Sequence, residues 1–190
     1  MANNVTNYLK IIANDDATNR IDEMFDMAGG YGETLKLSQA FFGEAAKDSN
    51  EWFLDNLGAK WVYVENNINM GEWNIQSANY APKEFFTHLY KLITEIDPEG
   101  YLEVRYEDES LDPVGALVIK KGPNGVCFNS EEEDDMEDPT EDMDWEDEGY
   151  DEAKMNFTDE KFELMDEQLE MCHRMIDSGK AEVLFESQTN

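Results

Sequence analysis

The chain has 190 residues and a formal net charge of −31, because 45 Asp and Glu stand against only 14 Lys and Arg. Since phosphate backbones attract proteins through Lys and Arg, this balance argues against direct binding to nucleic acid or to an anionic membrane surface. The hydrophobic fraction of 41% is still sufficient for a folded core.

The cysteines and the N-terminal segment indicate the cellular compartment. Cys127 and Cys172 are the only two cysteines and lie far apart, which favours a reducing environment over a disulfide scaffold. The segment MANNVTNYLKII lacks the basic start and apolar run of a signal peptide. No apolar stretch approaches the roughly 20 residues that span a bilayer. We therefore expect a cytoplasmic protein.

The first third of the chain predicts one strand and several helices. Alternating apolar residues over 8–13 predict a strand, and a helical pattern follows until Gly29-Gly30. Residues 31–48 indicate a further helical segment. Ser49 is a good N-cap for a short helix that Gly58 ends.

The middle of the chain predicts two hairpins around one long helix. Pro82 opens this helix, whose apolar residues keep helical spacing, and Asp97-Pro98 ends it. A Gly-Pro-Asn-Gly sequence predicts the second hairpin turn. The predicted strands of this region are 61–65, 72–78, 101–106, 114–120 and 126–128.

The composition changes abruptly at Ser130. Residues 131–152 hold 15 acidic residues and no basic one. A disordered, solubilising linker is one interpretation of this acidic segment. In the other, Trp145 and Tyr150 anchor in a pocket of a partner while the carboxylates steer the encounter.

A last helix, which Thr158 can cap, carries an apolar stripe at alternating steps of three and four residues. Such a stripe either pairs two chains into a homodimer or docks on the sheet of its own chain. Gly179 ends the helix before a short strand-like run over 181–185. The stripe consists of Phe162, Met165, Leu169, Cys172 and Ile176.

This order of elements predicts an α+β fold. Its most economical form is a ferredoxin-like βαββαβ antiparallel sheet with helices on one face and a helical insertion at about 31–58. We expect this domain to cover 1–129. The acidic segment then occupies 130–155, with order and disorder both open, and the last helix and short strand occupy 156–190.

Two segments resemble a known family. Residues 4–11 (NVTNYLKI) and 52–61 (WFLDNLGAKW) are similar to the Api-type ferredoxin-like proteins of phages, plasmids and genomic islands, and the likeness covers about 4–120. Before the second long helix the chain departs from the family, since 76–82 read QSANYAP in place of an aromatic, proline-rich stretch. The resemblance implies the fold and a mobile-element origin, hence a host-cell cytoplasm. It implies no activity.

No residue pattern predicts catalysis, a cofactor or a metal site. Asp144 to Glu152 imitate the first positions of a calcium loop, but Met155 stands where a bidentate Glu is required. His88 and His173 lack neighbouring ligands, and no nucleophile lies beside a base. We expect no enzyme activity, and we interpret the abundant carboxylates as solvated surface charge.

The charge pattern favours a protein that binds a basic, nucleic-acid-handling host protein and inhibits or redirects it, as a nucleic-acid mimic in the sharpest form. The alternative is a structural or dimerising accessory protein whose acidity only maintains solubility. The predicted partner-binding residues are Glu131, Glu132, Glu133, Asp134, Asp135, Glu137, Asp138, Glu141, Asp142, Asp144, Trp145, Glu146, Asp147, Glu148, Asp151 and Glu152.

Overall fold

The structure is a computed structural model that describes residues 3–111, 113–133, 136, 138–141, 143–147 and 149–186. The strands are β1 (Asn4–Ile12), β2 (Val62–Asn69), β3 (Glu72–Ala78), β4 (Tyr101–Asp108), β5 (Val114–Gly122), β6 (Gly125–Glu133) and β7 (Glu182–Glu186). The helices are α1 (Asp15–Met27), α2 (Thr34–Phe42), α3 (Asn50–Leu57), α4 (Lys83–Ile96) and α5 (Tyr150–Asp177), with a 3-10 turn, η1, at Gly43–Ala45.

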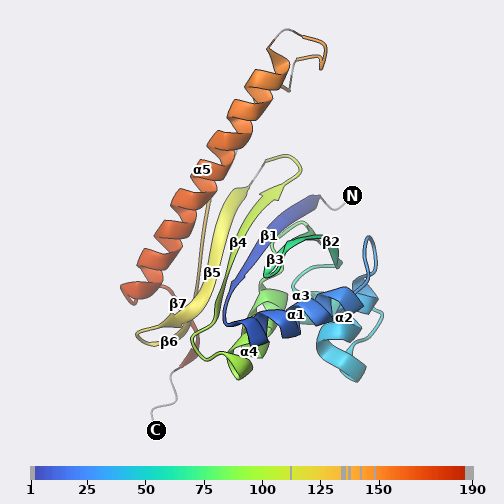
Figure 1. The fold of residues 1–190 in the computed structure, drawn as a ribbon, viewed down its shortest axis with the longest axis vertical. Coiled ribbons are helices and arrows are strands. Elements are labelled where there is room, and N and C mark those ends of the chain that lie inside the picture. The colour runs from blue at the N-terminus through green and yellow to red at the C-terminus, as the bar shows by residue number, and fades with distance from the viewer. Residues whose placement is uncertain are drawn as a thin grey trace.

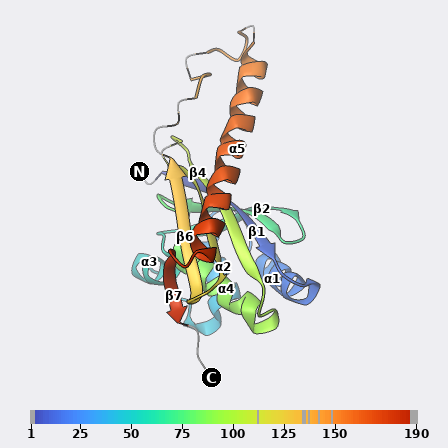
Figure 2. The same ribbon diagram turned by 90° about the vertical axis from the view of Figure 1, so that its left-hand side faces the viewer.

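All seven strands form one antiparallel sheet in the order β2-β3-β1-β4-β5-β6-β7. Helices α1 to α4 cover one face of this sheet, and α5 crosses the other (Figures 1 and 2). The α+β class is therefore confirmed. The strand order of the whole sheet differs from that of a four-stranded ferredoxin-like sheet, because β5, β6 and β7 extend it beyond β4.

The helices of the predicted domain, α1 to α4, share one face as expected, and the C-terminal helix covers the other face because β5 is apolar on both of its faces (Figure 1). Leu117 and Ile119 of β5 pack into the large core under α1 to α4. Ala116 and Val118, which alternate with them, pack into a second core under α5. A strand that is buried on both sides needs a cover on both sides, and α5 supplies the second one.

Local sequence signals explain the helix ends near the first core. The Ser49 side chain accepts a hydrogen bond from the Trp52 backbone N–H, and Gly58 ends α3 in the left-handed conformation.

The acidic segment has no comparable boundary. The expected domain boundary between 129 and 130 falls inside β6, which continues to Glu133.

Helix α5 is the longest element, with 28 residues. Its C-terminal part lies on the sheet, and its N-terminal turns project beyond the ends of the strands (Figure 1). Of the helices that the structure describes, none combines the length and the apolar composition that crossing a membrane requires.

Candidate protein-binding surface

The apolar stripe of the last helix lies inside the chain. Met165, Leu169, Cys172 and Ile176 are buried, and the last three pack against β5 and β6 in the second core. Phe162 is half-buried, and its ring centroid lies 5.4 Å from that of Tyr8 in an edge-to-face contact. Of the two arrangements that the stripe allowed, docking on the chain's own sheet is the one in this structure.

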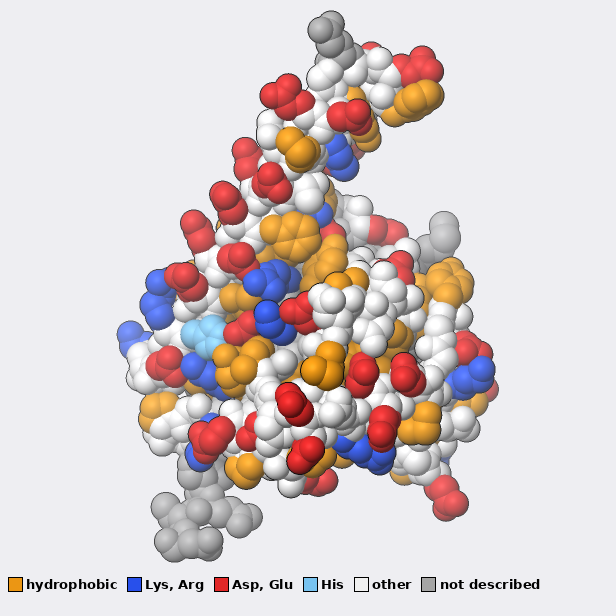
Figure 3. Space-filling model, in the orientation of Figure 1, with side chains coloured by type: hydrophobic (Ala, Val, Ile, Leu, Met, Phe, Trp, Pro, Cys, Tyr) orange, Lys and Arg blue, Asp and Glu red, His pale blue; other side chains and the backbone are white. Residues whose placement is uncertain are grey.

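Ion pairs along the same helix strengthen its contact with the sheet. Lys161 pairs with Glu107, and the Arg105 Nε donates to Asp166 Oδ1 at 2.7 Å. Further towards the C-terminus, Lys120 Nζ lies 2.8 Å from Asp177 Oδ1. Figure 3 shows Lys and Arg side chains gathered where α5 meets the sheet. Lys161, Arg105 and Lys120 are therefore engaged in holding α5 on the sheet.

The solvent side of α5 is acidic. Exposed carboxylates recur there at helical spacing, and Figure 3 shows them along the outer side of the helix. Residues three or four positions apart on a helix lie on the same face, about 5–6 Å apart. We call Asp159, Glu163, Glu167 and Glu170 the outer row.

The charge density of α5 can be compared with that of nucleic acid. A helix of 28 residues is about 42 Å long at about 1.5 Å per residue. Its nine Asp and Glu residues give roughly one carboxylate per 5 Å. One strand of DNA carries about one charge per 3.4 Å and the duplex about one per 1.7 Å. The helix alone therefore approaches a single strand and falls well short of a duplex.

The predicted acidic segment begins in strand β6 and ends in helix α5. Glu131, Glu132 and Glu133 form the end of β6, and Asp151 and Glu152 lie in the first turn of α5. Carboxylates in a first helical turn interact favourably with the helix dipole. These five residues therefore belong to regular elements and not to a separate linker.

Asp138 ties the intervening residues to α5. Its carboxylate lies 2.5 Å from Lys154 Nζ and accepts hydrogen bonds from the Thr140 backbone N–H and hydroxyl at 2.8 and 2.7 Å. Desolvation opposes ionisation of Asp138, but the bonds from Lys154 and Thr140 outweigh it and lower the pKa to about 2.

Trp145 is presented to solvent on a turn. The Asp144 backbone N–H donates to Asp147 Oδ2 at 2.8 Å, and the Asp147 N–H donates to the Asp144 carbonyl at 2.9 Å. The Trp145 side chain is 74% exposed on this turn. Glu141 and Glu146 are exposed nearby in the sequence. The predicted residues Asp134, Asp135, Glu137, Asp142 and Glu148 lie outside the described residues.

Sequence reasoning missed the outer row. Its four carboxylates fall between and beside the apolar stripe, and the steps of four, four and three residues from Asp159 to Glu170 were the available signal. The sequence interpretation followed the densest run of acids, in 131–152, and treated the later helix only as an apolar stripe.

The histidines and cysteines make contacts within the fold. His88 Nε2 lies 3.0 Å from the Phe41 carbonyl, its ring stacks on Phe42, and burial lowers its pKa. His173 Nε2 lies 2.8 Å from Glu103. Burial raises the pKa of the Cys172 thiol to about 11. Among the described residues, no group of three or more His, Cys, Asp or Glu is placed to hold a metal ion.

The chain was compared with known proteins at three levels. No family model matches it, and neither a curated protein nor a solved structure is significantly similar to it. The resemblance to the Api-type proteins over about 4–120 therefore stays a prediction.

Proposed function

We propose that this chain is a phage or mobile-element protein that binds a basic, nucleic-acid-handling host protein and inhibits or redirects it. Its binding surface comprises the outer row of α5 and the acidic segment 131–152. A cationic groove that normally follows a phosphate backbone is the complementary surface for such an array of carboxylates.

One observation carries the proposal. Lys161, Arg105 and Lys120 pair with carboxylates where α5 meets the sheet. The outer row faces solvent on the opposite side of the helix, where Arg174 is paired with Glu170. Acidity that served solubility alone has no need of a row of carboxylates gathered on one face of a helix. The separation of charge between the two sides of α5 favours recognition of a cationic partner.

The exposed Trp145 supports the same proposal. It lies among Asp144, Glu146 and Asp147 on the segment that leads into α5. Aromatic anchors surrounded by steering charges are typical of interface centres, since a buried indole contributes more to affinity than any single exposed carboxylate.

We further propose that residues 4–108 retain a ferredoxin-like βαββαβ unit. Support comes from the adjacent strands β2-β3-β1-β4 and from the two crossovers, one through α1 to α3 and one through α4. On this view β5 to β7 and α5 are an addition that carries the binding surface. The mobile-element origin depends on the same resemblance and is proposed with it.

The proposal is tested by capture with a charge-neutralised helix. In one variant the outer row is changed by Asp159→Asn, Glu163→Gln, Glu167→Gln and Glu170→Gln. The variant should remain folded, because it removes like-charge neighbours at helical spacing. A control variant removes four exposed carboxylates from the helical layer on the other face of the sheet, by Glu44→Gln, Asp48→Asn, Asp55→Asn and Glu95→Gln.

Wild type and both variants are used as bait in a host extract at low salt, and the captured proteins are identified by mass spectrometry. We expect wild type and the control to retain basic nucleic-acid-binding proteins that added duplex DNA displaces, and the outer-row variant to lose them. An equal loss of these proteins by both variants would show that only total charge matters, and full capture by the outer-row variant would show that the row makes no contact. Either result would contradict the proposal.

A further inference from the structure

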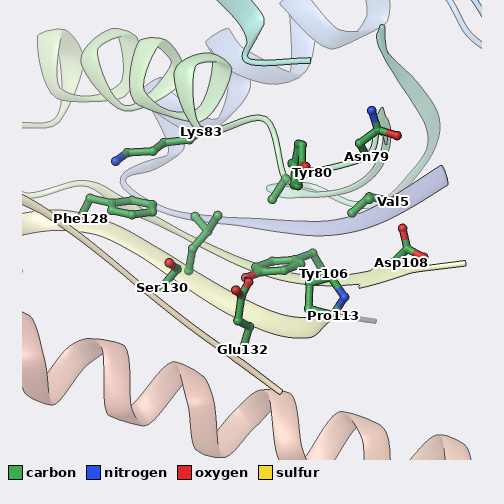
Figure 4. A pocket seen from close by; sticks show the side chains of 12 residues that line it. Val5, Asn79, Tyr80, Lys83, Tyr106, Asp108, Pro113, Phe128, Ser130 and Glu132 are labelled. Atoms are coloured by element: carbon green, nitrogen blue, oxygen red, sulfur yellow. The ribbon is translucent and has the colours of Figure 1, made fainter. Parts of the chain in front are cut away.

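A cavity lies on the helical side of the sheet, where the end of β6 meets the loop before α4. Its volume is about 290 Å³. Drug-sized ligands occupy pockets of about 300–1,000 Å³, so this cavity lies at the lower end of that range and has room for one long side chain. Figure 4 shows side chains from β1, β4, β5 and β6 and from the segment 79–83 around it.

The cavity combines apolar walls with acidic groups. Val5, Leu117 and the ring of Tyr106 are buried and form part of its lining. Asp108 and Glu132 contribute carboxylates. Such a lining fits a long aliphatic stem that ends in a cation, since the stem packs on the apolar walls and the head reaches a carboxylate.

One end of the cavity already holds an ammonium group. Lys83 Nζ lies 4.0 Å from the centroid of the Phe128 ring and 2.8 Å from Glu182 Oε2. Figure 4 shows Lys83 and Phe128 at one end, away from Tyr106 and Glu132. A ring of the lining, together with a carboxylate of β7 outside it, thus binds a lysine head at this end. The Tyr106–Glu132 side offers a ring and a carboxylate that both belong to the lining.

The Glu132 carboxylate is held in position. It accepts a hydrogen bond from the Tyr106 hydroxyl at 2.9 Å. The phenol ring lies over Gly115, where an added Cβ would come within 2.6 Å of the Tyr106 hydroxyl. Because the glycine leaves room for the ring, the hydroxyl reaches across to β6 and orients Glu132 towards the cavity (Figure 4).

We propose that this cavity receives the side chain of a lysine or arginine from the basic partner, with Glu132 as the recognising carboxylate and Tyr80 as an aromatic rim. The inference rests on the proposed function, because it assigns the partner a specific contact. Glu132 is among the first residues of the acidic segment. A basic protein that is attracted to the acidic segment therefore encounters the cavity where that segment begins.

The strand β6 provides a matched pair of variants. Ser130 and Glu132 line the cavity, whereas Glu133 is the next residue along β6 and does not line it. Glu132→Gln and Glu133→Gln remove the same charge from adjacent exposed positions. Gln retains an oxygen that accepts from Tyr106, so the fold is undisturbed. General electrostatic attraction predicts equal effects of the two substitutions.

The probes are an octa-arginine and an octa-lysine peptide, and their affinities for the full chain are measured by calorimetry at low salt. We expect Glu132→Gln to weaken binding of at least one peptide by about tenfold, because it removes a charge-assisted contact. Glu133→Gln should weaken binding by less than about twofold, because it removes only a distant charge that salt screens. Tyr80→Ala should weaken binding, whereas Tyr31→Ala, at another exposed tyrosine that does not line the cavity, should not.

Equal effects of Glu132→Gln and Glu133→Gln on both peptides would overturn the cavity assignment and leave the proposed function standing, because binding would then depend on charge alone. If wild type binds neither peptide at low salt, both proposals are wrong. Comparison of the two peptides identifies whether a guanidinium or an ammonium head fits better.

Discussion

Lys161 of α5 and Glu107 of β4 form the most buried ion pair among the described residues, with side chains 12% and 14% exposed. The Tyr8 hydroxyl donates to the same carboxylate at 2.5 Å. Burial and the negative charge of Glu107 raise the pKa of this phenol, so Tyr8 stays protonated and remains a donor at all ordinary pH values. This cluster joins the projecting helix to the first core strand.

Substituting Lys161 by Met leaves the Glu107 carboxylate partly buried without its cation. We expect this to lower the free energy of unfolding by about 1–3 kcal/mol, the range for an unsatisfied buried polar group. Chemical denaturation followed by circular dichroism measures it. Arg174→Met, which breaks the exposed pair with Glu170, is the control and should cost at most about 1 kcal/mol. Equal losses would show that the Lys161 pair has no special role.

The two cysteines report whether α5 is docked. Cys127 and Cys172 are both buried in the second core. Burial raises the pKa of the Cys172 thiol to about 11, so at pH 8 the reactive thiolate is nearly absent in the folded chain. We expect both thiols to react slowly with a disulfide reagent at pH 8, and Leu169→Ala to accelerate labelling by loosening α5.

The labelling experiment needs a control for global unfolding. Ile93→Val removes one methyl group from the first core, away from α5, and should leave the labelling rate close to that of wild type. Fast labelling of wild type would mean that α5 does not cover Cys172 in solution.

The link between Asp138 and Lys154 predicts a pH dependence. The folded pKa of Asp138, about 2, lies below its ordinary value of 3.8. Its contribution to stability is therefore fully present above pH 3.8 and is lost as the pH falls through about 2. Lys154→Met should raise the Asp138 pKa towards 3.8, which a carboxyl-carbon NMR titration measures. An unchanged titration would show that this ion pair does not form.

The contact between Gly115 and Tyr106 can be tested independently of any partner. Gly115→Ala places a Cβ 2.9 Å from the Glu131 carbonyl as well as against the Tyr106 ring. We expect a loss of about 1–3 kcal/mol from overpacking. Thermal unfolding measures the loss, and Gly30→Ala is a useful comparison because no atom lies within 4 Å of its added Cβ. A neutral Gly115→Ala would mean that Tyr106 lies elsewhere.

The local features of the fold were predictable from sequence. The Ser49 cap and Gly58 end of α3, and the amphipathic helix after Pro82, were expected close to their observed bounds because short-range chemistry determines them. The end of β6 was not, since Glu131 to Glu133 disfavour a strand by themselves. Their pairing with Val114 to Ala116 of β5, a non-local contact, makes them one.

The position of α5 likewise depends on contacts between residues that are far apart in the sequence. The sequence stripe from Met165 to Ile176 indicated an apolar helix face but not its partner, and only the pairing order of the sheet shows that the second face of β5 is open to receive it. The start of α5 at Tyr150 was also missed, because Asp151 and Glu152 were assigned to the acidic segment by composition.

The central claim is that the outer row and the acidic segment bind a cationic surface. The most direct measurement is the affinity of wild type and the outer-row variant for a captured partner as a function of salt. We predict that wild-type affinity falls steeply between 0.05 and about 0.5 M salt, as screening shortens below about 8 Å, and that the variant shows a shallower slope. An affinity that is independent of salt, or equal slopes for the two proteins, would contradict the account.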